Sequence, residues 1–267
     1  MISERYSRQS FIGEESEYQI KSRKIGIVGL GGGGSHIAQQ LAHIGFGDFV
    51  LYDPDTFEES NLNRTVGSKE KDVRNKIPKV NIAKRLIKGI KKNALVKTYK
   101  QRWQENSNPL RECDIIFGCV DGYQERHELE VSARRYFIPY IDIGLTVVHH
   151  PPRAPLMSGH VFLSLPNRPC MWCLGILSDK KLGEEALRYG DTGPRPQVIW
   201  ANGVLASTAA GIAIDLVTGW TQRKEKLVYL LYEGNPGIIA PNPRLAVINL
   251  DRKCPHHDAK KVGDPQI

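Results

Sequence analysis

The chain has 267 residues, of which 40% are hydrophobic, and this suits one large α/β domain or a domain with an appendage. No stretch approaches the roughly 20 consecutive apolar residues of a membrane span, and the N-terminus is too polar for a signal peptide. Five cysteines, two of them in a C-x-x-C, favour a reducing compartment with a metal site over a disulfide framework. We therefore expect a cytoplasmic protein that does not bind membranes.

The net charge of +8 is concentrated in one segment. Residues 69–102 hold 13 Lys and Arg against two acids, a local excess of +11, so the remainder is mildly acidic. Such a stripe can meet nucleic acid or an acidic protein, but it is typical of a solvated helix face. The segment has one aromatic residue, Tyr99, and so lacks the interleaved aromatic residues that stack on bases, which means that nucleic acid is not favoured.

The first half of the chain begins with a strand, a glycine-rich turn and a helix. Lys24–Val28 is a short apolar run rich in β-branched residues, which predicts a buried strand. Residues 29–34 satisfy G-x-G-x-x-G, and a helix is expected from Ser35 to about Ile44. Phe49–Tyr52 is predicted to be the second strand, and it ends at Asp53.

This pattern indicates a site for an adenine nucleotide. The first-turn amides of the helix and its positive dipole end form a phosphate site. An acid about 20 residues past the glycines usually accepts hydrogen bonds from a ribose. The pattern alone does not distinguish NAD, FAD and ATP.

The residues that follow favour a triphosphate. Asp53-Pro54-Asp55 is followed by Ser60-Asn61-Leu62-Asn63-Arg64, and a dehydrogenase needs no Asn and Arg on this loop. A glycine loop, then D-x-D, then S-N-L-x-R resembles the bacterial ubiquitin-activating superfamily, the ThiF/MoeB/HesA-like adenylating enzymes. The resemblance runs from about Arg5 to His257.

The resemblance implies a Rossmann-like, mostly parallel sheet with helices on both faces, a C-terminal antiparallel extension and a zinc site that closes it. It implies ATP-dependent adenylation of the C-terminal carboxylate of a ubiquitin-like or sulfur-carrier protein that ends in Gly. Asn61, Arg64, Lys79 and Arg8 would contact phosphates, and Asp121 would hold Mg²⁺. The nucleotide-binding residues implied are Gly29, Gly31, Gly32, Gly34, Asp53, Asp55, Asn61, Arg64, Lys79 and Asp121.

The N-terminal sequence R-Y-x-R-Q matches a signature of the same family. Arg8 takes the position of the second arginine, which reaches the nucleotide phosphates of the other subunit. Arginine suits this role because its fixed fork can clamp phosphate oxygens with two hydrogen bonds. The resemblance therefore implies a homodimer in which Arg8 acts in trans.

Lys79 and Asp121 lie next to predicted elements of secondary structure, one at the start of a helix and the other after a strand. Pro78 to about Lys92 has apolar residues at helical spacing, and a lysine in its first turn suits a nearby phosphate more than the helix dipole. Lys76 is the rival candidate. The strand predicted at 114–119 ends near Asp121, at the edge where open α/β sheets place ligands and where an Asp can hold Mg²⁺. Gly122 replaces the Asn usual in the family, so one polar contact near the adenosine is missing.

The second half of the chain departs from alternating strands and helices. We divide one continuous domain into residues 1–146, the nucleotide-binding half with its N-terminal arm, and 147–267. The predicted antiparallel strands are Val161–Leu165, Lys226–Tyr232 and Leu245–Leu250. Residues 178–198 are expected to be a mobile crossover loop, and 200–218 a small-residue helix.

A metal site is predicted near the C-terminus. Cys170 and Cys173 form a C-x-x-C, and Cys254 stands in a second half-site with His257 or, less favoured, His256. Four such ligands suit tetrahedral Zn²⁺, and the related family binds structural zinc at these two places. No cysteine lies between Cys173 and Cys254, where thioester-forming relatives carry their nucleophile.

The two remaining cysteines, Cys113 and Cys119, flank or end a buried strand, where a small buried hydrophobe is the expected role. We therefore expect adenylation without an enzyme thioester. Alternatives stay open. These are adenylation of a small or tRNA-borne carboxylate, as in threonylcarbamoyl-adenosine dehydratase-like proteins, an NAD-binding oxidoreductase, and a non-catalytic binding module. The downstream acceptor, whether sulfur, an amine or another enzyme, is not indicated by the sequence.

Overall fold

A single eight-stranded sheet forms the centre of the computed structural model, which describes residues 3–149, 151–166, 168–187, 196–223, 228–248 and 256. The strand order is β3-β2-β1-β4-β5-β6-β7-β8. The strands are β1 (Lys24–Val28), β2 (Asp48–Tyr52), β3 (Leu95–Tyr99), β4 (Ile115–Gly118), β5 (Tyr140–Val148), β6 (Leu156–Ser164), β7 (Val228–Glu233) and β8 (Ile238–Pro241).

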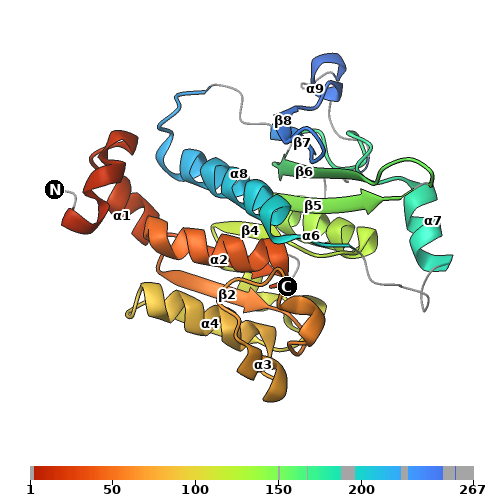
Figure 1. Cartoon of the computed structure of the whole chain (residues 1–267). Coiled ribbons are helices and arrows are strands. Elements are labelled where there is room, and N and C mark those ends of the chain that lie inside the picture. Colours follow the sequence, from red (N-terminus) through yellow and green to blue (C-terminus); the bar gives the residue numbers. More distant parts are fainter. Residues whose placement is uncertain are drawn as a thin grey trace.

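The sheet changes from parallel to antiparallel at β5. Strands β3, β2, β1, β4 and β5 pair in parallel, whereas β5–β6, β6–β7 and β7–β8 are antiparallel. The predicted fold class, a mostly parallel sheet with an antiparallel extension, is confirmed. The predicted boundary at residue 147 falls inside β5, so one sheet runs through both halves (Figure 1).

Helices cover both faces because the parallel strands are apolar on both sides. One core cluster joins alternate strand residues such as Ile25, Ile27 and Phe49 to α2, α4 and α8; the other joins Val50 and Ile116 to α5 and α6. Figure 1 shows α2 and α8 side by side on the first face. The helices are α1 (Ser16–Lys21), α2 (Gly32–Ile44), α3 (Glu70–Arg74), α4 (Lys79–Ile90), α5 (Asn108–Arg111), α6 (Tyr123–Arg135), α7 (Asp179–Leu187), α8 (Ile199–Thr218) and α9 (Arg244–Val247). Three 3₁₀ helices are η1 (Glu4–Ile12), η2 (Glu59–Asn61) and η3 (Trp103–Asn106).

Two sequence-based expectations were wrong for part of their length. The segment expected to be a crossover loop begins with α7, which follows Ser178, whose hydroxyl accepts a hydrogen bond from the amide of Lys181 at 3.3 Å. The strand predicted at 245–250 is replaced by α9 over its first part. The Asn242 side chain accepts the Arg244 amide at 2.9 Å, a local cap that overrides the apolar pattern.

Among the described residues, α8 is the one helix long and apolar enough to cross a membrane by length and composition. Half of its apolar window is buried. Its buried positions, including Leu205, Ala206 and Ala209, belong to the main core. This arrangement is that of the central helix of a folded domain.

The carboxyl ends of β1, β2 and β4 lie at one edge of the sheet, because these strands are parallel and paired in register. The residues that follow them, 29, 31–33, 53–55 and 119–122, line one cavity of about 860 Å³. The fold thus brings together the three segments that the sequence analysis singled out.

Candidate nucleotide site and metal cluster

The turn between β1 and α2 is packed too tightly for side chains. Gly29 has φ +87°, and a Cβ there would lie 2.5 Å from the carbonyl oxygen of Cys119. A Cβ on Gly34 would lie 1.9 Å from the Gly29 carbonyl oxygen. Helix α2 begins at Gly32 with Gly31 as its N-cap, and no side chain in the described part of the chain caps its first turn. Since Gly29, Gly31 and Gly32 line the cavity, this helix end is suited to an anion.

Asp53 fixes the second wall of the cavity. Its carboxylate accepts the amide of Leu30 at 2.7 Å and the amide of Asp55 at 2.8 Å, and the residue is 4% exposed. Burial raises the pKa of Asp53, although the charge of Lys79 opposes this effect. The side chain therefore ties the glycine turn to β2 and lies in the cavity wall.

Lys79 brings a cation to the same cavity. Its ammonium lies 2.6 Å from the Asp55 carboxylate, and its backbone amide donates to the Asp55 carbonyl at 3.1 Å. Lys79 and Asp55 both line the cavity, whereas the rival Lys76 is an exposed residue with φ 47° and does not. Of the two candidate lysines, Lys79 is therefore the one that lies in the cavity wall.

The loop around η2 places some of its predicted residues in the cavity and one outside it. Arg64 lines the cavity and donates to the Ser60 carbonyl and, at 3.1 Å, to the side-chain oxygen of Asn63. Asn61 is buried and is not among the lining residues. Its side-chain oxygen accepts the Glu58 amide at 3.2 Å, so in this structure Asn61 caps η2.

Asp121 and Gly122 lie at the cavity rim, directly before α6. The first-turn amides of α6 are capped by a residue that the sequence analysis missed. The Glu185 carboxylate of α7 accepts the amides of Tyr123 at 3.0 Å and Gln124 at 2.9 Å. No local sequence motif predicts this contact, because 62 residues separate the Tyr123 amide from Glu185.

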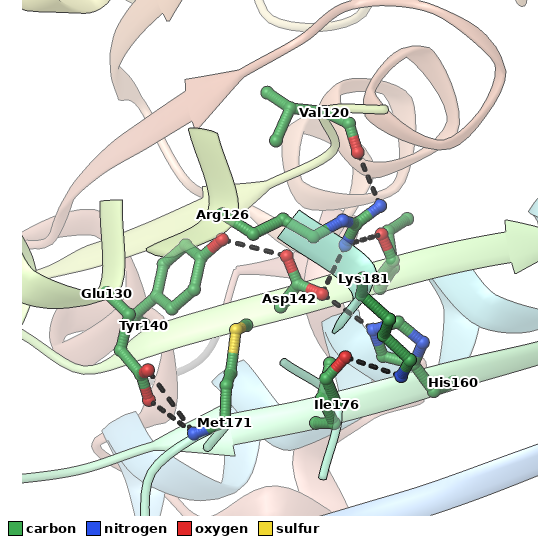
Figure 2. A network of polar contacts seen from close by, with 10 residues as sticks. Val120, Arg126, Glu130, Tyr140, Asp142, His160, Met171, Ile176 and Lys181 are labelled. Atoms are coloured by element: carbon green, nitrogen blue, oxygen red, sulfur yellow. Dashed lines mark hydrogen bonds and ion pairs between the residues drawn. The ribbon is translucent and has the colours of Figure 1, made fainter. Parts of the chain in front are cut away.

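A buried ionic network underlies the cavity, and the sequence analysis did not predict it (Figure 2). Arg126 pairs with Asp142 and donates to the carbonyls of Val120 and, at 3.0 Å, Ile143. His160 lies 2.7 Å from the same carboxylate, and the Tyr140 hydroxyl donates to it at 2.8 Å. The only signal in the sequence was the presence of ionisable residues inside apolar strands.

The network holds Asp142 ionised. Burial alone would raise the pKa of Asp142, but Arg126, His160 and Tyr140 outweigh it, so this pKa lies below its usual value. Because Arg126 and Gly144 line the cavity, the network fixes its floor where the sheet turns antiparallel.

Arg8 lies away from this cavity. It is exposed on η1, and its neighbours Arg5 and Gln9 donate to the carbonyls of Ile90 at 2.5 Å and Ile44 at 2.8 Å. Ile90 and Ile44 end α4 and α2, which return to the amino edge of the sheet. Arg8 is not among the cavity-lining residues of its own chain.

Cys170, Cys173 and His256 form a cluster suited to a metal ion. The two sulfurs are 3.7 Å apart, and the His256 Nδ1 lies 3.5 Å from each. Tetrahedral bonds of about 2.3 Å to sulfur and about 2.0 Å to nitrogen would give separations of about 3.8 Å and about 3.5 Å. The structure thus brings His256, the less favoured alternative, to the cysteines. Cys254 and His257 lie outside the described residues, and their roles stay predictions.

Helix α6 supports the C-x-x-C turn. The buried Glu130 carboxylate accepts the Met171 amide at 3.1 Å, and the Trp172 indole donates to His127 at 3.1 Å (Figure 2 shows the Glu130 contact). Trp172 also stacks on His256, with ring centroids 5.8 Å apart. The donor set and its support fit a structural zinc ion.

The remaining cysteines are poor nucleophiles. Burial raises the pKa of Cys113 to about 12 and also raises the pKa of Cys119 above its usual value. Cys119 lines the cavity but its thiolate is disfavoured. This agrees with the expectation that neither forms a thioester.

Comparison with known proteins identifies the family. The ThiF family profile matches residues 4–251. The chain belongs to the ThiF family. Over 142 residues it is 32% identical to the molybdopterin-synthase adenylyltransferase of Haemophilus influenzae, covering 51% of this chain and 58% of that protein. It is 30% identical over 176 residues to the sulfur carrier protein ThiS adenylyltransferase of Bacillus subtilis, covering 64% and 50%.

The fold of this ThiF-family chain also matches a solved structure. Escherichia coli MccB with ATP superposes with a TM-score of 0.74 at 20% identity, covering 95% of this chain and 73% of MccB. That likeness shows a shared fold. The chain spans 58% and 50% of the lengths of the two curated relatives described above.

One prediction follows for the Arg126–Asp142 pair. Asp142→Asn should lower the free energy of unfolding by about 3–5 kcal/mol, because it leaves Arg126 buried without its counter-charge. The control is Asp114→Asn, whose partner Arg23 is partly exposed, with an expected loss of about 1 kcal/mol or less. Urea titration measures both.

The pH dependence has a definite sign. Since the folded pKa of Asp142 is lowered, its stabilisation is complete above the unfolded value of about 3.9 and is lost as pH falls through the folded pKa. The wild type should therefore lose more stability on acidification than Asp142→Asn. Parallel losses in the two proteins would contradict the assignment.

Proposed function

We propose that this chain adenylates a C-terminal carboxylate with ATP and releases pyrophosphate. The observation that carries the proposal is the convergence of the glycine turn, Asp53 and Lys79 in one cavity. The relatives named above are adenylyltransferases, which supports ATP chemistry over the alternative of an NAD-binding oxidoreductase. We propose a cytoplasmic setting.

In this mechanism one anion attacks another, so positioning and cations carry the catalysis. The carboxylate oxygen attacks the α-phosphorus, the bond to the bridging oxygen of pyrophosphate breaks, and an acyl-adenylate forms. The amides of the glycine turn hold phosphate oxygens, and Asp53 accepts hydrogen bonds from the ribose. Lys79 and Arg64 balance the charge of the β- and γ-phosphates. Asn61 would reach a phosphate only by leaving its contact with Glu58.

Asp121 is the proposed magnesium residue. Its carboxylate is exposed at the rim of the same cavity, and Mg²⁺ prefers oxygen ligands. Bound Mg²⁺ would neutralise phosphate charge. The proposed acceptor is a ubiquitin-like or sulfur-carrier protein that ends in Gly, by analogy with the ThiS adenylyltransferase relative.

We also propose a homodimer with Arg8 in trans. The outer face of α8 carries Trp200, Val204 and Gly211 and no charged residue, and the exposed Phe11 and Trp220 stack edge to face with centroids 5.6 Å apart. An uncharged face of this kind is typical of a subunit interface. Arg8 does not line the cavity of its own chain. In the proposed dimer, Arg8 of the partner subunit would therefore complete each site.

The second candidate function is adenylation of a tRNA-borne carboxylate. It is favoured by one observation, the exposed cations on and next to α3, α4 and β3. They include Lys69, Lys71, Arg74, Lys84, Arg85, Lys88, Lys92 and Lys97. Phosphate contacts from such a surface would make RNA binding strongly salt-dependent.

Pyrophosphate exchange tests the adenylation directly. Wild-type protein should exchange labelled pyrophosphate into ATP only when an acceptor carboxylate is added. Asp121→Ala should reduce the rate about 100-fold, because charge stabilisation is lost at the phosphates. Asp114→Asn, at the opposite edge of the sheet, is the control. Exchange supported by tRNA and abolished by salt would favour the second candidate, and equal rates with Asp121→Ala would remove the magnesium assignment.

Complementation tests Arg8 in trans. Arg8→Ala and Asp121→Ala should each be nearly inactive alone. After mixing and subunit exchange, half of the dimers are mixed and each has one intact site, so about one quarter of wild-type activity should return. The double variant, Arg8→Ala with Asp121→Ala, should stay inactive, because none of its dimers has an intact site. No recovery in the mixed sample, with mixed dimers present by mass spectrometry, would refute action in trans.

Metal analysis tests the zinc site. Purified protein should contain about one zinc per chain, because the cluster has tetrahedral spacing. Cys173→Ser should lose the zinc and unfold at a lower temperature, whereas Cys113→Ser should keep it. Zinc content unaffected by Cys173→Ser would reject the cluster as the metal site.

A further inference from the structure

The N-terminal arm, which is the 3₁₀ helix η1, depends for its shape on the helices that it contacts. It has nine residues, and 3₁₀ runs longer than three or four residues are uncommon because their hydrogen-bond geometry is poor. Its buried residues are Tyr6 and Ile12, whereas Arg8 is exposed. An arm with so little buried surface keeps this conformation only where other parts of the chain hold it.

Two of the contacts that hold the arm use carbonyl groups at the ends of helices. The Gln9 side chain donates to the Ile44 carbonyl at the end of α2, and Arg5 donates to the Ile90 carbonyl at the end of α4. The last carbonyls of a helix have no partner inside it, so donors from outside satisfy them. The charge of Arg5 also complements the negative end of the helix dipole. The arm thus bridges the two helix ends.

The Tyr6 ring is packed where these two helix ends meet (Figure 1 shows the arm beside α2). Gly45 has φ +126°, and a Cβ there would lie 3.2 Å from the Tyr6 Cζ, so the glycine leaves room for the ring. The guanidinium of Arg5 and the ammonium of Lys91 lie 5.7 Å and 5.8 Å from the ring centroid. Lys91, which follows α4, also donates to the Gly45 carbonyl and so ties α4 to α2.

We propose that Tyr6 and Gln9 are positioning residues that hold Arg8 in place for the cavity of the partner subunit. Arg8 stands between them in sequence, so contacts on both sides fix the backbone from which its side chain extends. The inference rests on the proposed action of Arg8 in trans.

Helix α2 explains why the arm serves the other subunit. Its first residues belong to the glycine turn of its own cavity, and its last residue accepts the arm. At a rise of about 1.5 Å per residue, its 13 residues separate the arm from that turn by about 20 Å. One rigid helix therefore has a phosphate receptor at one end and, at the other, the arginine that is donated to the partner.

Subunit exchange distinguishes positioning from a general effect on the fold. Tyr6→Ala should lower pyrophosphate exchange about 100-fold, the cost of misplacing a catalytic group by about 1 Å. Gln9→Ala should lower it about tenfold, the value of one hydrogen bond. Mixed with Asp121→Ala, Tyr6→Ala should recover about one quarter of wild-type activity, because its intact cavity receives Arg8 from an intact arm. Mixed with Arg8→Ala it should recover nothing, because every cavity then receives a defective arm.

Two further variants serve as controls. Tyr6→Phe should keep wild-type activity, because the ring makes the contacts described above. Gln19→Ala, a glutamine on α1 outside these contacts, should also behave as wild type. Suppose that Arg8→Ala and Asp121→Ala complement each other. Recovery of Tyr6→Ala by Arg8→Ala instead of by Asp121→Ala would then show that Tyr6 supports its own subunit's cavity. That result would overturn the inference and leave the proposed function standing.

Amide hydrogen exchange tests the hold on the arm without catalysis. In Tyr6→Ala and Gln9→Ala the amides of residues 4–12 should exchange at least about tenfold faster than in wild type, and those of α8 at the wild-type rate. Unchanged hydrogen exchange in the arm of both variants would overturn the inference even if activity falls. If wild type never incorporates pyrophosphate into ATP, the proposed function fails, and hydrogen exchange alone decides whether Tyr6 and Gln9 hold the arm.

Discussion

The Asp53 carboxylate, which accepts the amide of Leu30, is the contact on which the rest of the site depends. It holds the glycine turn against the end of β2, and the closest packing in the turn, between Gly34 and Gly29, leaves no room for a side chain. Burial disfavours the charged form of this carboxylate. Its two amide donors and the nearby ammonium of Lys79 oppose that effect. The cavity is thus a consequence of packing in the sheet, with its charges fixed in advance of ligand binding.

Helix α6 connects the separate parts of the molecule. Its first turn lies beside Asp121 and is capped by Glu185, and its next residues carry Glu125 and Arg126 into the cavity wall. The next residue, His127, and Glu130, about one turn further along, contact the C-x-x-C turn. Through this helix the C-x-x-C turn is connected to the cavity rim. A metal ion held by the proposed cluster would therefore stabilise a helix that also lines the cavity.

Short-range signals in the sequence predicted the nucleotide half well. The glycine turn, Asp53 and Lys79 lie where their local patterns place them, because each stands at the end of a strand or the start of a helix that its own neighbours in sequence predict. The contacts that were missed link distant segments. Glu185 caps a helix 62 residues away, and His160 reaches Asp142 across paired strands. The error at α9 has the opposite cause, since the Asn242 cap is local but was outweighed by an apolar run.

The central claim is that a carboxylate oxygen attacks the α-phosphorus of ATP in the cavity over the glycine turn. The most direct measurement uses an acceptor whose C-terminal carboxylate is labelled with ¹⁸O and follows the label by mass spectrometry after turnover. Attack at the α-phosphorus leaves one labelled oxygen in AMP when the acyl group is transferred onward, and this is the result that the account predicts. Label in inorganic phosphate, or none in any nucleotide product, would contradict it.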